Sequence, residues 1–156
     1  MAGTIDRRLA ELGIELPRAS APVANYVPFV ITGNQVFVSG QVPVVDGEIR
    51  YRGRLGDGMS IDEGYQAARA CGLCVIAQVK EACGGDLDRV VRCVKLGGFV
   101  ASAPDFTDQP KVVNGASDLM VEAFGDKGNH ARFAVGMAAR PFGVAVEVDA
   151  VFEIVI

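Results

Sequence analysis

An arginine and a glutamate near the end of the chain have side chains suited to catalysis on a small acid. Arg132 opens an apolar segment, and Glu147 lies fifteen positions later in a second one. A guanidinium group can hold a carboxylate by two parallel hydrogen bonds. A glutamate can orient a water molecule and remove its proton. The two residues together are therefore suited to binding a carboxylate substrate and directing water at it.

The segment that carries the glutamate predicts a strand from Val144 to Ile156. Its even-numbered residues are all apolar, whereas its odd-numbered residues include Glu147, Asp149 and Glu153. Side chains alternate between the two faces of a strand, so the apolar row should pack under helices. We expect the acidic row to lie on the other face, at an interface, in a pocket or in solvent.

The segment that carries the arginine predicts the preceding strand, from Ala131 to Ala138. If the turn at 140–143 joins the two strands as a hairpin, Arg132 meets the acidic row and faces Glu147. Stability alone is a weak reason for such a pair, because an exposed ion pair contributes less than about 1 kcal/mol.

The elements that must position these residues follow from periodicity and from end signals. In chain order we expect a helix over 5–13, an extended stretch over 16–23, strands over 27–32 and 35–39, a helix over 60–82, a strand over 87–100 with a bulge at 97–98, a helix over 110–124 and the two final strands. Ser60 and Glu63 form a capping box at the start of the first long helix. Strand pairs alternating with helices predict one α+β domain over residues 1–156, with helices on one face of a mixed sheet. Residues 1–20 add an N-terminal helix and an extended arm.

Composition excludes several classes of function. The chain has 156 residues and a net charge of −4, so nucleic acid is a poor expectation for a partner. No apolar run approaches the roughly 20 residues of a membrane helix, and the charged N-terminus does not resemble a secretory signal. We expect a cytoplasmic protein with free thiols and no membrane partner.

The cysteines and the single histidine do not predict a metal site. Cys71 and Cys74 have the CxxC spacing, but they lie inside a predicted helix rather than at its start. No second CxxC accompanies them. His130 directly precedes the arginine strand, and we expect it to be a surface loop residue rather than part of a cleft.

Several short patterns together resemble the RidA (YjgF) family. They are Ser39-Gly40-Gln41-Val42-Pro43 at the end of an early strand, Tyr26 thirteen positions before Ser39, Glu122-Ala123-Phe124 at the end of the second long helix, and Ala131-Arg132 followed by Glu147 within Val146–Ala150. Their order and spacing match the family from about residue 20 to the end of the chain. The N-terminal helix resembles a subgroup of that family.

The resemblance implies a chorismate-mutase-like fold with two main helices packed on one face of a mixed sheet. It also implies a homotrimer with a cleft at each subunit interface. The implied activity is hydrolysis of reactive enamines or imines to 2-keto acids and ammonia, with no metal and no bound cofactor.

The resemblance also assigns roles to individual residues. Arg132 binds the substrate carboxylate and Glu147 activates water. Tyr26 closes the pocket, while main-chain groups after Ser39, such as the Gly40 carbonyl, hold the substrate nitrogen or the water. Glycine permits such a close approach of the main chain. Ser39 belongs to the same binding site, but we expect its own side chain to be structural.

The chain departs from the family pattern at two positions. Ala134 stands where many members carry a cysteine, although alanine keeps the backbone N–H expected to contact substrate. The asparagine of the family's second helix has no clean match, since alignment through Glu122 places Asp118 there and Asn114 one turn earlier. A carboxylate at 118 would repel an acidic substrate.

These departures favour an alternative function for the same pocket, namely binding a small carboxylate without turnover. A ribonuclease, a name often attached to this family, ranks third because the protein is acidic and has a single histidine.

Overall fold

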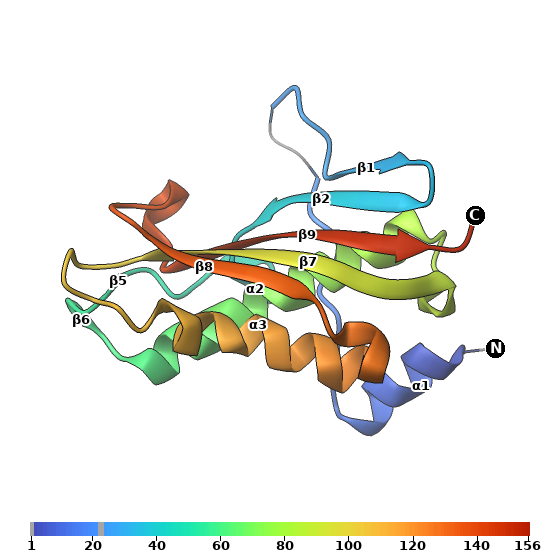
Figure 1. Cartoon of the computed structure of the whole chain (residues 1–156), viewed down its shortest axis with the longest axis horizontal. Helices are drawn as coiled ribbons and strands as arrows, with labels where there is room; N and C mark the ends of the chain where they lie inside the picture. The colour runs from blue at the N-terminus through green and yellow to red at the C-terminus, as the bar shows by residue number, and fades with distance from the viewer. Residues whose placement is uncertain (1, 22–23) are drawn as a thin grey trace.

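Five strands form one mixed sheet in the order β1-β2-β9-β7-β8 (Figure 1). The computed structural model describes residues 2–21 and 24–156, so the extended stretch expected over 16–23 is described only as far as residue 21. The strands are β1 (Phe29–Thr32), β2 (Gln35–Gln41), β7 (Val90–Ala101), β8 (Ala131–Met137) and β9 (Val146–Ile154). This sheet and the helices on it confirm the predicted α+β class.

The last strand, β9, lies at the centre of the sheet and anchors the core. Its burial alternates along the whole strand, and the side chains at 146, 148, 150, 152 and 154 are all buried. Burying one large aliphatic or aromatic side chain contributes about 1.5–3 kcal/mol, so this row is a major part of the core. The prediction that the even face packs under helices is confirmed.

The predicted hairpin between the last two strands is wrong. β8 pairs in parallel with β7, with Leu96 opposite Arg132 and Gly98 opposite Ala134. β9 pairs antiparallel with β7 on its other side. A helix separates β7 from β8 in the chain, and a helical crossover returns the next strand in the same direction. β7 therefore lies between the strand of Arg132 and the strand of Glu147.

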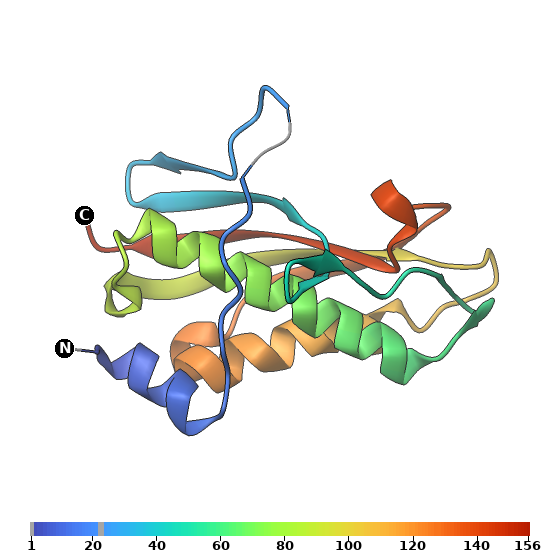
Figure 2. The same cartoon turned by 180° about the vertical axis from the view of Figure 1, so that it is seen from behind.

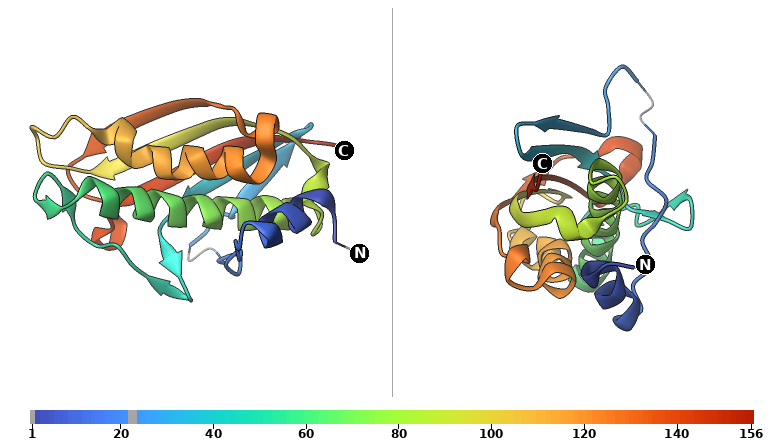
Figure 3. Two further views of the ribbon diagram at one scale, coloured as in Figure 1. Left: turned by 90° about the horizontal axis from the view of Figure 1, so that it is seen from below. Right: turned by 90° about the vertical axis from the view of Figure 1, so that its right-hand side faces the viewer.

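Two long helices, α2 (Ile61–Ala82) and α3 (Gln109–Phe124), cover one face of the sheet (Figure 3). The predicted capping box at Ser60 and Glu63 is present at the start of α2. The helices approach closely at Gly115, where any Cβ would overlap the main-chain carbonyl of Tyr65. This close packing places α3 over β7 and β8.

The bulge predicted at Gly97 and Gly98 is wrong, because the register of β7 shifts earlier, between Val90 and Lys95. The two glycines instead make room on both faces of the sheet. A Cβ at Gly97 would overlap Phe133 and Asp149, and a Cβ at Gly98 would overlap Val113 of α3. Gly98 therefore faces the helices and Gly97 faces away from them.

The face of the sheet away from the helices carries exposed apolar side chains. They include Val30, Phe37, Val135 and Met137, which are each at least 37% exposed. We call this surface the open face. Monomeric proteins rarely leave a large contiguous apolar patch in water, so the open face is suited to assembly.

Short elements connect the layers. They are β3 (Val44–Val45), β4 (Glu48–Ile49), β5 (Arg54–Leu55), β6 (Gly58–Met59) and the 3-10 turns at Leu87–Arg89, Gly125–Gly128 and Pro141–Gly143. Within the described residues, no helix is both long and apolar enough to cross a membrane.

The N-terminal helix α1 (Thr4–Glu11) is followed by an arm, residues 14–21, which runs across α2 (Figure 2). Gln78 of α2 is 1% exposed, and its Nε2 donates a hydrogen bond of 2.9 Å to the Ser20 carbonyl. A buried amide without a partner is costly, so this bond holds the arm in place.

Docking of α1 depends on a carboxylate distant in sequence. The main-chain N–H groups of Thr4 and Ile5 donate to Asp88 at 2.8 and 2.9 Å. These bonds satisfy donors at the helix start and favour the ionised carboxylate. They lower the pKa of Asp88 below the usual value of a carboxyl.

We expect Asp88→Ala to release α1 while the sheet stays folded. Because the folded-state pKa of Asp88 is lowered, its contribution is present above the ordinary carboxyl pKa of about 4 and is lost as pH falls through the folded-state value. Hydrogen exchange should become faster in the amides of residues 4–12 and stay unchanged in β9. Glu11→Ala, an exposed change on the same helix, is the control. Equal protection of the α1 amides from hydrogen exchange in Asp88→Ala and Glu11→Ala would contradict this account.

Candidate functional site

Glu147 lies on β9, on the open face, directly over the main chain of Gly40 at the end of β2. A Cβ at position 40 would overlap the end of the Glu147 side chain, so any other residue there would displace the carboxylate from this position. Both residues line a cavity of about 270 Å³ together with Tyr26. The other residues that line it are Ser20, Ala21, Pro28, Gln41, Val42, Val44, Ile49, Pro141 and Phe142. The structure thus brings three of the predicted site residues together.

Glu147 has a cationic neighbour that the sequence analysis did not identify. Arg140 Nη1 lies 3.7 Å from Glu147 Oε1, and the arginine also stacks over the Phe99 ring, 5.3 Å from its centre. Their side chains are 13% and 21% exposed, so the pair is largely shielded from water. At 3.7 Å the contact is an ion pair rather than a short hydrogen bond, which leaves the second carboxylate oxygen directed at Gly40.

Arg132 lies on β8, at the edge of the sheet, and is held from α3. Its Nη1 donates to Asn114 Oδ1 at 2.7 Å and to Ser117 Oγ at 3.2 Å. Among residues 2–21 and 24–156, no carboxylate forms an ion pair with Arg132. The guanidinium is therefore anchored by neutral groups and keeps its charge uncompensated.

The structure distinguishes between the two candidate residues on α3. Asn114 contacts Arg132, whereas Asp118 accepts a 2.7 Å hydrogen bond from the Tyr65 hydroxyl of α2. That bond, together with partial burial of the hydroxyl, raises the pKa of Tyr65 to about 12. Asp118 thus links the two helices and is not brought to Arg132. The carboxylate that would repel an acidic substrate is therefore directed at Tyr65 instead.

Ser117 is a contact of Arg132 that the sequence analysis missed. It lies three residues after Asn114, and residues at that spacing share one face of a helix. The three-residue spacing from Asn114 is the sequence feature from which this contact could have been predicted. His130 lies in the loop before β8, as expected, but the residue is half-buried, with Nε2 2.9 Å from Ser117 Oγ and Nδ1 2.6 Å from the Gly128 carbonyl.

Arg132 and Glu147 do not face each other within one chain, contrary to the prediction. Ala134 pairs with Gly98, which faces α3, and Arg132 shares that side of β8. Glu147 pairs with Phe99 on the open face, on the far side of β7. The two residues therefore lie on opposite faces of the sheet. We call the surroundings of each residue a candidate half-site.

Two further predicted contacts have defined positions. The Ser39 hydroxyl donates to the Val27 carbonyl at 2.7 Å, which holds the segment after Tyr26 against β2. Ala134 is half-buried on β8, two residues after Arg132 on the same face.

The CxxC cysteines do not form a reactive site. Cys71 and Cys74 are buried within α2, and burial raises the pKa of both thiols. A thiolate is the reactive form, so these thiols are inert at neutral pH. In the part of the chain that the structure describes, no cluster of histidine, cysteine and acidic residues could hold a metal ion.

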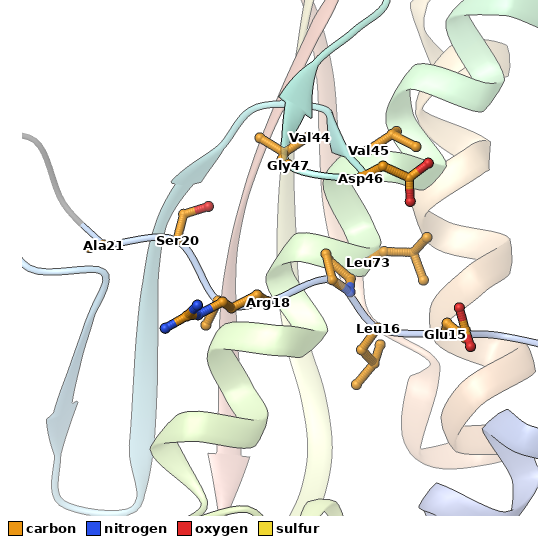
Figure 4. Close-up of a pocket in the computed structure, with 12 residues that line it drawn as sticks. Glu15, Leu16, Arg18, Ser20, Ala21, Val44, Val45, Asp46, Gly47 and Leu73 are labelled. Atoms are coloured by element: carbon orange, nitrogen blue, oxygen red, sulfur yellow. The ribbon is translucent and has the colours of Figure 1, made fainter.

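A second cavity of about 770 Å³ adjoins the Glu147 half-site. It lies between the arm, the β3–β4 hairpin and Leu73 of α2 (Figure 4). Ser20, Ala21 and Val44 line both cavities. The arm is thus a wall of the Glu147 half-site, which the sequence analysis did not anticipate.

The comparisons with known proteins agree with this fold. A family profile described as "YjgF/chorismate_mutase-like, putative endoribonuclease" matches residues 6–151. The chain belongs to this family. The chorismate-mutase-like fold and the resemblance to RidA (YjgF) proteins are thereby confirmed.

Individual relatives cover nearly the whole chain or its larger part. Protein TCP17 of Trypanosoma cruzi is 52% identical over 98% of this chain and 96% of its own length. The protein Atu1372 of Agrobacterium tumefaciens, of unknown function, is 47% identical with a TM-score of 0.90, covering 97% of this chain and 94% of that one. TdcF of E. coli, solved with bound serine, is 25% identical with a TM-score of 0.62, covering 87% and 93%.

Proposed function

We propose that this protein hydrolyses reactive enamines or imines of amino acids to 2-keto acids and ammonia. The observation that carries the proposal is the anchored, uncompensated guanidinium of Arg132 at the edge of the sheet. Such a group is suited to a carboxylate, which it binds by charge-assisted hydrogen bonds. The TdcF structure, whose ligand has a carboxylate and an amine on one carbon, supports this substrate class.

The reaction requires the protein to position the substrate and to supply one general base. Glu147 takes a proton from water as the water oxygen attacks the C=N carbon, and it gives this proton to the nitrogen, which forms the carbinolamine. Glu147 then takes the proton of the carbinolamine hydroxyl and passes it to the nitrogen. The C=O bond forms as the C–N bond breaks and ammonia leaves, so both protons of the water end on the ammonia. The Gly40 main chain and Tyr26 border the same cavity. No metal or cofactor takes part in this scheme.

The half-sites combine if copies of the chain assemble. Arg132 of one copy and Glu147 of another would then border one cleft, and we propose a homotrimer with such a cleft at each interface. The exposed apolar side chains of the open face support assembly, because association would remove them from water. We further propose that the protein acts in the cytoplasm, where its four thiols remain reduced.

A mixing experiment tests the composite site directly. Arg132→Ala and Glu147→Gln each disable a different half-site, so homotrimers of either variant should be inactive. If equal amounts are mixed and reassembled at random, about one quarter of interfaces combine an intact Arg132 with an intact Glu147. We expect about a quarter of the wild-type rate toward 2-aminoacrylate, read as pyruvate release. The composite site would be contradicted if the mixed variants show no activity, or if the protein has a monomeric mass in solution.

A second function for the same pocket is carboxylate binding without turnover. The ion pair of Glu147 with Arg140 favours it, since one oxygen of the carboxylate already faces a cation instead of being free for a water molecule. Wild-type protein that binds 2-oxobutyrate but does not accelerate pyruvate release from 2-aminoacrylate would establish this reading. The endoribonuclease activity in the family description is less favoured, because a net charge of −4 does not attract a polyanion.

A further inference from the structure

A chain of hydrogen bonds leads from Arg132 into the protein and ends on a main-chain carbonyl. It runs from Arg132 Nη1 to Ser117 Oγ at 3.2 Å, from Ser117 Oγ to His130 Nε2 at 2.9 Å, and from His130 Nδ1 to the Gly128 oxygen at 2.6 Å. The proposed chemistry does not use Ser117 or His130. Their arrangement nevertheless restricts how Arg132 can bind an acid.

For a neutral ring, the last link determines the direction of every proton in the chain. A carbonyl oxygen only accepts, so His130 Nδ1 carries the hydrogen and Nε2 of the neutral ring has a free lone pair. The Ser117 hydroxyl must then donate to Nε2. Its oxygen consequently presents lone pairs to Arg132, which only donates.

The same links occupy one end of the guanidinium. Nη1 has two hydrogens, and Asn114 and Ser117 accept one each. Among the described residues, no hydrogen bond from Nε or Nη2 of Arg132 is present. The edge formed by Nε and Nη2 therefore remains for a carboxylate, and two parallel bonds fit that edge.

We infer that Ser117 and His130 are positioning residues, which orient Arg132 so that it binds the substrate carboxylate through its Nε–Nη2 edge. This inference rests on the proposed carboxylate site. If Asn114 were the only acceptor, a single hydrogen bond would hold Nη1 and the guanidinium could rotate about that hydrogen bond. The second acceptor on Nη1 prevents that rotation, and His130 keeps the serine oxygen in the accepting orientation.

The tautomer of His130 can be measured without any substrate. His130 is the only histidine of the chain, so 15N-histidine labelling gives one unambiguous pair of ring resonances. For the neutral ring we expect a protonated Nδ1 and an unprotonated Nε2. Ser117→Ala should shift the Nε2 resonance, because it removes the donor. Protonation at Nε2 in the wild-type protein would overturn the inference.

Binding and kinetics test the consequence for the acid. Relative to wild type, we expect Ser117→Ala to weaken 2-oxobutyrate binding and raise KM about 5- to 20-fold, with kcat changed less than about threefold. Ser117→Thr keeps the hydroxyl and should stay close to wild type, which separates positioning from mere packing. Ser117→Ala that binds 2-oxobutyrate as well as wild type overturns the inference alone, whereas wild-type protein that binds no acid overturns the proposed function itself.

Discussion

Arg132→Ala should lower kcat/KM toward 2-aminoacrylate by about 10²- to 10³-fold, mostly through KM. Removing one partner of a shielded, hydrogen-bonded charge pair costs about 2–5 kcal/mol, and about 3–4 kcal/mol corresponds to this factor. Two features of the structure make the effect large. The guanidinium is already oriented by Asn114 and Ser117, and no acidic side chain in the described part of the chain competes for it.

Arg132→Lys separates charge from geometry in the same position. Lysine keeps the positive charge but has no planar fork, so it should recover only part of the lost affinity. Steady-state kinetics and titration with 2-oxobutyrate measure both variants. Arg7→Ala, an exposed arginine of α1, is the matched control and should behave as wild type. Equal affinity for 2-oxobutyrate in wild type and Arg132→Ala would remove the carboxylate site from this residue.

Glu147→Gln should lower kcat by about 10²- to 10⁴-fold, which is the usual contribution of a general base. Glutamine has nearly the same shape, so the packing over Gly40 is preserved and KM should change little. Single-turnover release of pyruvate from 2-aminoacrylate, together with 2-oxobutyrate affinity, distinguishes lost chemistry from lost binding. A variant that loses binding instead of rate would indicate that Glu147 holds the ligand.

A residue on the same strand supplies the control for this prediction. Glu153 lies on the same face of β9 and accepts a hydrogen bond from Asn34 at 3.3 Å, away from the cavity at Gly40. Glu153→Gln should keep the wild-type rate. If Glu147→Gln also keeps it, another group activates the water, and the carboxylate-binding function without turnover becomes the better account of the pocket.

The sequence by itself determined the elements and the inner face of the central strand. The alternation of apolar residues from 144 to 156 specified which side of β9 meets the helices, because burial of that row dominates the energy. The Ser60–Glu63 capping box located the start of α2 through hydrogen bonds among neighbours in the chain. The family resemblance carried by Tyr26, Gly40 and Glu147 implied one pocket, and these residues do line one cavity.

Only the tertiary structure decided how these elements are ordered and which site residues meet. Alternation along a strand defines its two faces but carries no information about which strand lies beside it. The crossover through α3 placed β7 between β8 and β9, and the register of β7 with these two strands put Arg132 and Glu147 on opposite faces. Helix packing likewise turned Asp118 toward Tyr65 and Asn114 toward Arg132. The strand order and these side-chain partners depend on contacts between residues distant in sequence, so no local sequence pattern could predict them.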